Sequence, residues 1–306
     1  MVTALGLAAA LALGLSGCGN HGAAAATGPP LSSFDLVVVA SAANDPLNAD
    51  LYGIRFDPIS AVQITHGKKI STVDATADQV VVAAADGQVD QLAFVGPEGE
   101  LSEIPDLGRP FAFNPSFVNG HTLMFDDVLV PKKDVQVNRT LVWDLTAKAK
   151  TVLFQTTDTL IGSTPGPDGQ VALIRERKNG RKSVVVRDPS GTTKEIAVDG
   201  DIGKLDWGPR YIAVGLNNAG RKAGDDPSIA TILLDPVAGK QLQLGASEPI
   251  AWTPDGTKLL VRQTGDRANS QLAFFDAAKP DALQRLGGIT GLVIYSGAWV
   301  RGSAVS

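Results

Sequence analysis

Short apolar runs recur along most of this 306-residue chain, and each ends in a turn at nearly constant spacing. The runs are rich in Val, Ile, Leu and Phe, and no sustained 3.6-residue apolar period accompanies them, which favours strands over helices. The turns fall at Asp57, Gly96, Asp144, Asp188, Asp235 and Asp276, at intervals of 39, 48, 44, 47 and 41 residues. A strand-built repeat of this length restricts the chain to few architectures.

A second marker keeps the same period. The stretches "WTPDGTKLLV" at Trp252, "PGPDGQVALI" at Pro165 and "FVNGHTLMF" at Phe117 each combine a strand end, a tight turn and a new apolar strand, and "DWGPRYIAV" lies between the first two. One unit therefore holds four strands, the last three exemplified by Lys258–Arg262, Gln271–Asp276 and Leu283–Leu286. Forty-odd residues in four antiparallel strands form the blade of a β-propeller. Counting predicts an all-β chain with six four-stranded blades.

The two ends of the repeat predict how the ring closes. The first unit lacks an initial strand, whereas "YSGAWVRG" near the C-terminus is a strand ending at Trp299 with nothing after it. We expect this strand to pair with Phe34–Ala40 and to complete the first blade, which would leave no open edge in the ring. Trp207, Trp252 and Trp299 then occupy equivalent positions and pack between blades.

The N-terminus predicts export and a lipid anchor. Ala4–Leu15 is apolar and too short for a membrane span, so it has the character of a signal peptide. Leu15-Ser16-Gly17-Cys18 resembles the lipobox of bacterial lipoproteins, in which cleavage precedes a lipidated cysteine; the chain departs from that pattern because no Lys or Arg precedes the apolar run. Cys18 is the only cysteine, so it has no partner for an internal disulfide. The expected organisation is a signal peptide over 1–17, a lipidated tether over 18–33 and one propeller domain over 34–306.

The Pro-Asp-Gly turns carry a second resemblance. "WTPDGTKLLV" is similar to the repeat of TolB-like propellers, which is clear at Pro167-Asp168-Gly169 and Pro254-Asp255-Gly256 and degenerate in the other units. The resemblance runs from about Phe34 to the end and implies the fold and a cell-envelope setting. TolB has an additional N-terminal domain where this chain has a tether, so TolB's own partners are not implied.

Residues with catalytic potential are few. The three histidines, His21, His66 and His121, have no metal-ligand spacing, and the chain has no zinc-protease, nucleophile-elbow or phosphate-loop motif. The aspartates that close the repeat are explained by turn chemistry, because Asp bonds the backbone two residues on. We expect no catalytic residues, no metal and no cofactor. Carboxylates from distant blades could still meet in the central channel.

The charge balance points away from nucleic acid and toward another kind of partner. The net charge is −5, which argues against nucleic-acid binding. Loops joining the second and third strands of each blade share one face. Those expected for blades three to five, Asp126–Asn138, Glu176–Arg181 and Asn217–Ser228, carry cations. Solvated loop tips are the simplest interpretation; the alternative is an arc that binds an anionic partner. The candidate binding residues are Lys132, Lys133, Arg177, Lys178, Arg181, Lys182, Arg221 and Lys222.

These observations favour a monomeric lipoprotein on the extracytoplasmic face of the cell membrane. Its propeller would act as a non-enzymatic binding or scaffold module for a protein or an anionic envelope polymer. The alternative is a propeller hydrolase or lactonase with a metal in the central channel, which several converging Asp, Glu or Asn side chains would favour.

Overall fold

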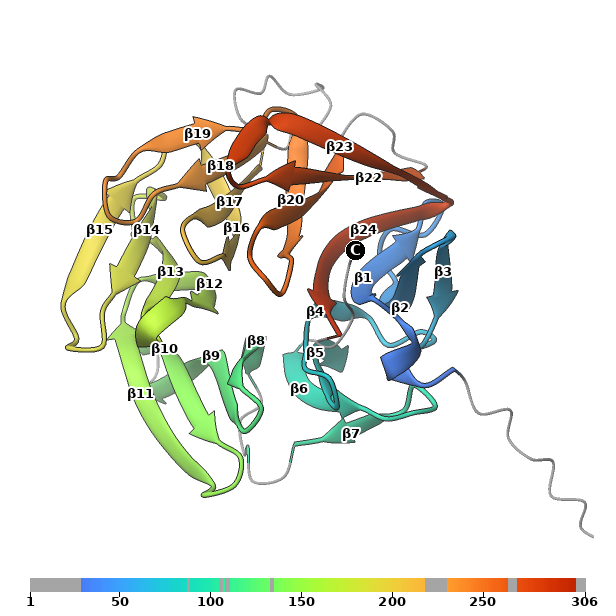
Figure 1. Cartoon of the computed structure of the whole chain (residues 1–306). Helices are drawn as coiled ribbons and strands as arrows, with labels where there is room; N and C mark the ends of the chain where they lie inside the picture. Colours follow the sequence, from blue (N-terminus) through green and yellow to red (C-terminus); the bar gives the residue numbers. More distant parts are fainter. Residues whose placement is uncertain are drawn as a thin grey trace, which may run out of the picture.

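The computed structural model describes residues 29–86, 89–104, 107, 111–132, 135–217, 230–263 and 269–300. These residues form six four-stranded antiparallel sheets arranged as blades around a ring (Figure 1). The prediction of a six-bladed β-propeller is therefore confirmed. Cys18 and the candidate residues Lys133, Arg221 and Lys222 lie outside the described residues. In the described ranges, no helix has the length and apolar character needed to cross a bilayer.

In each blade the strands follow one another from the channel outward in chain order, except that the last strand of the chain is innermost in blade 1. Blade 1 contains β24 (Leu292–Trp299), β1 (Leu36–Ala42), β2 (Ala49–Phe56) and β3 (Ile59–Gln63). Blade 2 contains β4 (Ile70–Ala75), β5 (Val80–Asp86), β6 (Val89–Val95) and β7 (Leu101–Glu103). Blade 3 contains β8 (Ala112–Asn119), β9 (Thr122–Lys132), β10 (Val135–Asp144) and β11 (Ala149–Thr156).

Blades four to six follow the same order. Blade 4 contains β12 (Thr159–Pro165), β13 (Val171–Glu176), β14 (Lys182–Arg187) and β15 (Thr193–Ala197). Blade 5 contains β16 (Asp201–Trp207), β17 (Ile212–Asn217), β18 (Ala230–Leu234) and β19 (Gln241–Gln243). Blade 6 contains β20 (Ser247–Trp252), β21 (Lys258–Gln263), β22 (Asn269–Asp276) and β23 (Lys279–Thr290). Two short 3₁₀ turns, η1 (Leu31–Ser33) and η2 (Pro167–Gly169), complete the elements.

The core lies between the blades, and it explains why the second strands have continuous apolar runs. In β13, Val171, Ala172, Leu173 and Ile174 are all buried, because each face of the sheet packs against a neighbouring blade. Outer strands such as β15 and β19 are mostly exposed. Burial is therefore greatest in the second strands, lower in innermost strands such as β12 and β16 that line the channel, and lowest at the rim.

The first and last strands of the chain, β1 and β24, pair in blade 1, as predicted. β24 pairs with β1 from Leu36↔Trp299 to Ala42↔Leu292, so a C-terminal strand closes the ring beside an N-terminal one. Phe34, immediately before β1, packs on Gly53, where a Cβ would lie 2.4 Å from the Phe34 ring. Residues nearly the whole chain apart therefore share one sheet.

The aspartates that mark the repeat form the expected turns. Asp144 Oδ1 accepts from the N–H groups of Thr146 and Ala147, and Asp235 Oδ1 accepts from those of Val237 and Ala238. These backbone bonds also hold the pKa of Asp235 below its usual range. Such carboxylates are engaged in local structure.

Each blade has two ends, which define two faces of the ring. The turn face carries the connections from first to second strands, such as Pro167–Gly169, and the hairpin face carries those from second to third strands. Blade 3 differs from expectation on the hairpin face: its polar segment from Asp126 to Asn138 was expected to be a loop, but β9 runs to Lys132 and β10 begins at Val135. The alternating valines extend the ladder beyond the other hairpins.

Candidate functional site

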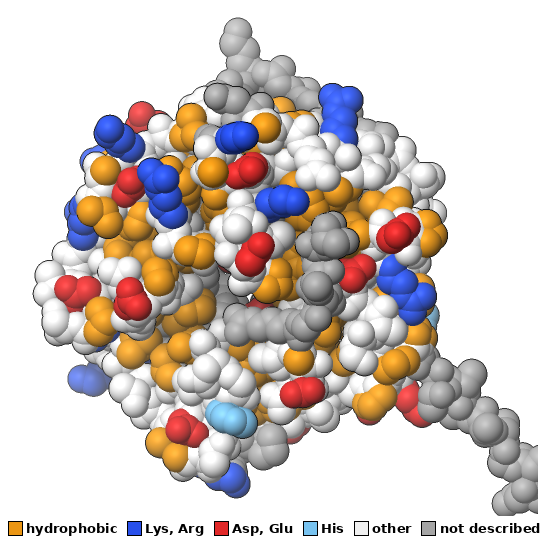
Figure 2. Space-filling view, in the orientation of Figure 1, with side chains coloured by type: hydrophobic (Ala, Val, Ile, Leu, Met, Phe, Trp, Pro, Cys, Tyr) orange, Lys and Arg blue, Asp and Glu red, His pale blue; other side chains and the backbone are white. Residues whose placement is uncertain are grey.

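The central channel is the main cavity found among the described residues, with a volume of about 610 Å³. All six innermost strands line it, and the ring is hollowed at its centre (Figure 2). On the face shown in Figure 2, Lys and Arg side chains alternate with Asp and Glu side chains. A volume of this size is typical of small-ligand pockets.

A β-bulge recurs in the innermost strand of every blade at a similar level. The pairing between the first and second strands shifts register at Ile70/Thr72, Phe113/Ser116, Leu160/Gly162, Ile202/Lys204, Pro249/Ala251 and Val39/Ala40. A bulge leaves one residue unpaired and frees its backbone groups. In blade 4, the carbonyl of the unpaired Ile161 accepts a bond of 2.9 Å from Asn114 Nδ2 of blade 3.

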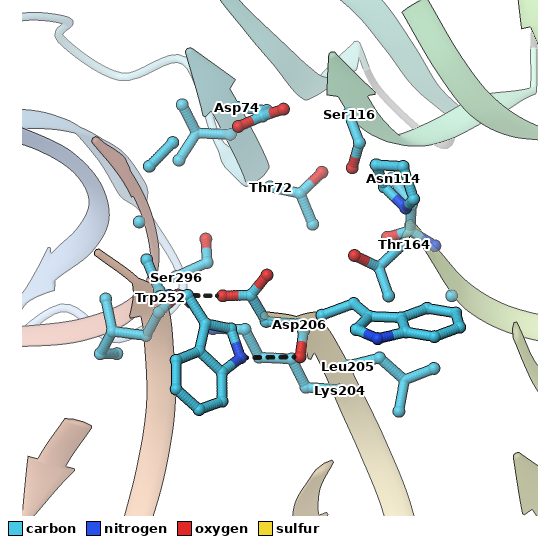
Figure 3. A pocket seen from close by; sticks show the side chains of 18 of the residues that line it. Thr72, Asp74, Asn114, Ser116, Thr164, Lys204, Leu205, Asp206, Trp252 and Ser296 are labelled. Carbon is cyan, nitrogen blue, oxygen red and sulfur yellow. Dashed lines mark hydrogen bonds between the residues drawn. The ribbon is translucent and has the colours of Figure 1, made fainter. Parts of the chain in front are cut away.

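Lys204 on β16, one of the side chains that line the channel (Figure 3), makes similar bonds to carbonyls of two other blades. Its Nζ donates to the carbonyls of Pro249 at 2.7 Å and Tyr295 at 3.0 Å, and it lies 3.5 Å from that of Ile250. One ammonium thus links blades 5, 6 and 1. Burial lowers the pKa of Lys204, and the nearby carboxylates of Glu248 and Asp206 offset part of that effect.

Two channel carboxylates hold neighbouring blades together. Asp206 Oδ2 accepts the N–H of Trp252 at 2.8 Å, and Asp74 Oδ2 accepts the N–H of Phe117 at 2.6 Å. The two aspartates occupy equivalent positions on blades 5 and 2, which lie opposite one another in the ring. Burial raises the pKa of Asp206, and the Trp252 N–H opposes this shift. Both carboxylates therefore act in contacts between blades.

The tryptophans pack between blades, as their spacing predicts. The indole of Trp207 covers Gly166 of blade 4, where a Cβ would lie 2.4 Å from the ring. The indole of Trp252 covers Gly208 of blade 5 in the same way, at 2.5 Å. Trp299 packs against Phe56 and Phe274, with ring centroids 5.5 Å and 6.1 Å away.

A buried carboxyl group, Asp126, is hydrogen-bonded to the channel residue Asn114. Asp126 on β9 accepts from Thr140 Oγ1 at 2.6 Å and from Asn114 Nδ2 at 3.2 Å, so it orients the amide that reaches Ile161. Burial raises the pKa of Asp126 to about 6, against the lowering effect of these bonds.

We expect the Asp126→Asn variant to reveal this shift. Between pH 3.8 and about 6 the folded protein binds more protons at Asp126 than the unfolded chain does, so this group lowers the free energy of unfolding as pH rises. Asn cannot ionise, so the variant does not undergo this decrease in the free energy of unfolding. The difference in free energy of unfolding between variant and parent should therefore shift in favour of the variant by about 2 to 3 kcal/mol from pH 4 to pH 7. Urea denaturation across this range measures it, and a constant difference would contradict it.

The predicted basic residues are only partly described, and some are engaged. Lys132 is exposed at the end of β9. In blade 4, Arg177 pairs with Glu195 at 2.6 Å and Lys182 pairs with Asp201, whereas Lys178 and Arg181 are exposed without an ion-pair partner among the described residues. The arc therefore remains a prediction, with part of its charge neutralised locally.

The channel residues were not found from the sequence. Lys204, Asp206 and Asn114 look like ordinary strand residues, and one weak signal was available. Lys204 and Asp206 lie three and one positions before Trp207, and Asn114 lies three positions before Phe117. Because side chains alternate along a strand, odd spacings place these residues on the face opposite the aromatic ring.

The channel lining combines charged side chains held between blades with buried hydroxyls. In the part of the chain that the structure describes, no group of three or more His, Cys, Asp or Glu side chains could hold a metal ion. The described carboxylates Asp74, Asp206 and Glu248 in the channel lining therefore belong to no such group. The hydroxyls of Thr72 and Ser296 are buried in the lining without a partner among the described residues. Fold and channel together define the class of six-bladed propellers with a polar central cavity.

Comparison with known proteins supports this fold. No protein-family model matches the chain, and neither does any curated protein. Among solved structures, TolB from Acinetobacter baumannii is similar over 89% of this chain and 68% of that one, with 16% identity and a TM-score of 0.62. A putative TolB from Agrobacterium tumefaciens covers 87% of this chain and 98% of its own, with 8% identity and a TM-score of 0.59. The tricorn protease matches 86% of this chain over 30% of its own, with 11% identity and a TM-score of 0.56. At these identities the likeness establishes the fold alone.

Proposed function

We propose that this protein is a lipid-anchored cell-envelope lipoprotein whose propeller binds a partner without catalysing a reaction. The channel carries this proposal. Three of its ionisable groups, Lys204, Asp206 and Asp74, make bonds between blades, and Glu248 pairs with Arg262. The hydroxyls of Thr72 and Ser296 lack partners among the described residues. Side chains that are engaged in bonds between blades determine the shape of the cavity. A general acid or base must instead be within hydrogen-bond distance of the substrate.

The envelope setting is supported from two sides. The sequence Leu15-Ser16-Gly17-Cys18 resembles a lipobox, and solved TolB structures share the fold. Two acyl chains hold a protein stably on a bilayer, whereas one gives only marginal binding. The uncharged segment from Gly19 to Ser33 suits a tether between anchor and ring.

The anchor is tested by the Cys18→Ser variant, which cannot form the thioether. We expect the parent chain to remain in the membrane fraction after a high-salt wash and most of the variant to move to the soluble fraction. Incorporation of a labelled fatty acid into the parent and not into the variant identifies the lipid. A Ser variant that stays with the membrane would remove the anchor from the proposal.

The binding role has its own test. The purified chain is assayed against ester, lactone and peptide substrates with and without added divalent cations, and we expect no turnover. A cation-dependent activity that Asp206→Asn abolishes would replace the binding role with the hydrolase interpretation. That substitution keeps an oxygen able to accept the Trp252 N–H, so loss of activity would not follow from misfolding.

A further inference from the structure

The blade 3 hairpin has long strands and exposes apolar side chains near its end on the hairpin face. β9 and β10 contain 11 and 10 residues, whereas the equivalent strands β13 and β14 of blade 4 contain 6 each. Val130 is 62% exposed and Val135 is 41% exposed at this end. Phe111, 42% exposed, lies beside the hairpin, because its carbonyl accepts the Val128 N–H at 3.2 Å. We call Phe111, Val130 and Val135 the blade 3 patch.

Cations border the blade 3 patch. Lys132 is paired with Val135 across the hairpin, and the basic hairpin of blade 4 belongs to the neighbouring blade on the same face of the ring. Asp158 connects the two: its carbonyl accepts from Asn138 Nδ2 at 2.8 Å, and its Oδ2 lies 3.8 Å from Arg175 Nε. Beyond Arg175 this hairpin exposes Lys178 and Arg181, the two cations of the hairpin without an ion pair among the described residues.

The position of the patch favours a protein over a lipid surface. Leu36 pairs with the last residue of β24, so the chain enters blade 1 at the turn face. The blade 3 patch is on the opposite face, at the connection between a second and a third strand. If the N-terminal tether holds the ring to a membrane, as proposed above, the patch is directed away from that membrane.

We propose that the blade 3 patch docks a protein partner that presents carboxylates around an apolar contact. Interfaces commonly combine an apolar centre with a polar rim, and charges at the rim steer the encounter and set its orientation. Val130 and Val135 supply the centre, and Lys132, Lys178 and Arg181 supply the rim. This inference rests on the proposed binding function and adds to the channel a second surface, which would contact a protein partner.

The test uses a photo-crosslinking amino acid at Val130 in the full chain, expressed in its native cells. The matched control is the same residue at Val237, which is 86% exposed and lies in the turn from β18 to β19 on the turn face. We expect one protein adduct at position 130 and none at position 237. Because both positions are solvent-exposed, folding should be unaffected, and equal melting temperatures check this.

Specificity is then measured with the crosslinker at Val135. Val130→Asp and the double variant Lys178→Glu, Arg181→Glu should each reduce the same adduct by at least about tenfold, and high salt should reduce it in the parent. A lipid adduct, an adduct of two copies of this chain, equal adducts at both control and patch, or an adduct indifferent to these variants would overturn the proposal. A membrane-bound parent without an adduct contradicts the patch alone, whereas an adduct on a chain that is not membrane-bound contradicts the anchor alone.

Discussion

Deleting Tyr295–Ser306 is expected to leave the protein largely unfolded at 25 °C. The deletion removes most of β24, so the inner edge of β1 loses its ladder and Leu36, Val37, Val38 and Val39 lose cover on one side. It also removes Trp299 from its contacts with Phe56 and Phe274 and takes the Tyr295 carbonyl from Lys204. Burying one large apolar side chain contributes about 1.5–3 kcal/mol. The combined loss of about 5 kcal/mol or more approaches the whole stability of a typical domain.

A circular permutant is the matched control for this deletion. Val300 N–H donates to the Asp35 carbonyl at 3.2 Å, so the two segments lie close together and a linker can run from Val300 to the residues before Phe34, which is retained because it is buried. A chain that begins at Leu292, passes through this junction and ends at Gly291 keeps β24 beside β1. Thermal and urea denaturation should show near-parental stability for the permutant and a lost cooperative transition for the deletion. Equal stability of the deletion variant and the parent would contradict closure by β24.

The second large effect is expected from Lys204→Met. Methionine fills a similar volume but donates no hydrogen bond, so the partly buried carbonyls of Pro249 and Tyr295 lose their donor. Asp206 and Glu248 also lose a nearby positive charge. Leaving buried polar groups unpaired costs about 1–3 kcal/mol for each group, so we expect the free energy of unfolding to fall by about 3 kcal/mol or more.

Lys194 provides the control, because it makes similar bonds on the surface. Its Nζ donates to the carbonyls of Pro236 at 3.0 Å and Val237 at 2.8 Å, also across a blade boundary, but the side chain is exposed. Water can replace those bonds, so Lys194→Met should change the free energy of unfolding by at most about 0.5 kcal/mol. Equal effects of the two substitutions would show that Lys204 is not a buried link between blades.

Local chemistry made the fold predictable. The bonds of Asp144 and Asp235 to nearby N–H groups depend only on residues next in sequence, so the turns keep their spacing wherever the blades lie. Ring closure followed from counting, because one strand was missing at Phe34 and one was left over at Trp299. The turns could be predicted from residues within one repeat, and ring closure could be predicted from the number of strands in the first and last repeats.

The channel could not be predicted in this way. Lys204 contacts Tyr295, and Asn114 contacts Ile161, so each bond joins residues 47 or more positions apart. Only the closed ring brings these groups together, and no spacing rule links a lysine to a free carbonyl in another blade. The prediction of a long loop in blade 3 was wrong for a different reason. Lys-Lys-Asp within this segment is typical of a loop, whereas the alternating valines on both sides extend the ladder.

Closure by the final strand also sets a time order for folding. A chain emerges from its N-terminus first, so β1 is available long before β24 is made. The segment Leu36-Val37-Val38-Val39 is apolar and mostly β-branched. Until β24 has been synthesised, one edge of this strand has no partner. Edges of this kind recruit strands from other molecules. The segment most prone to intermolecular pairing is therefore the one left open longest, and crowded nascent chains are at risk of exchanging their last strands until residues 292–299 of the same molecule arrive.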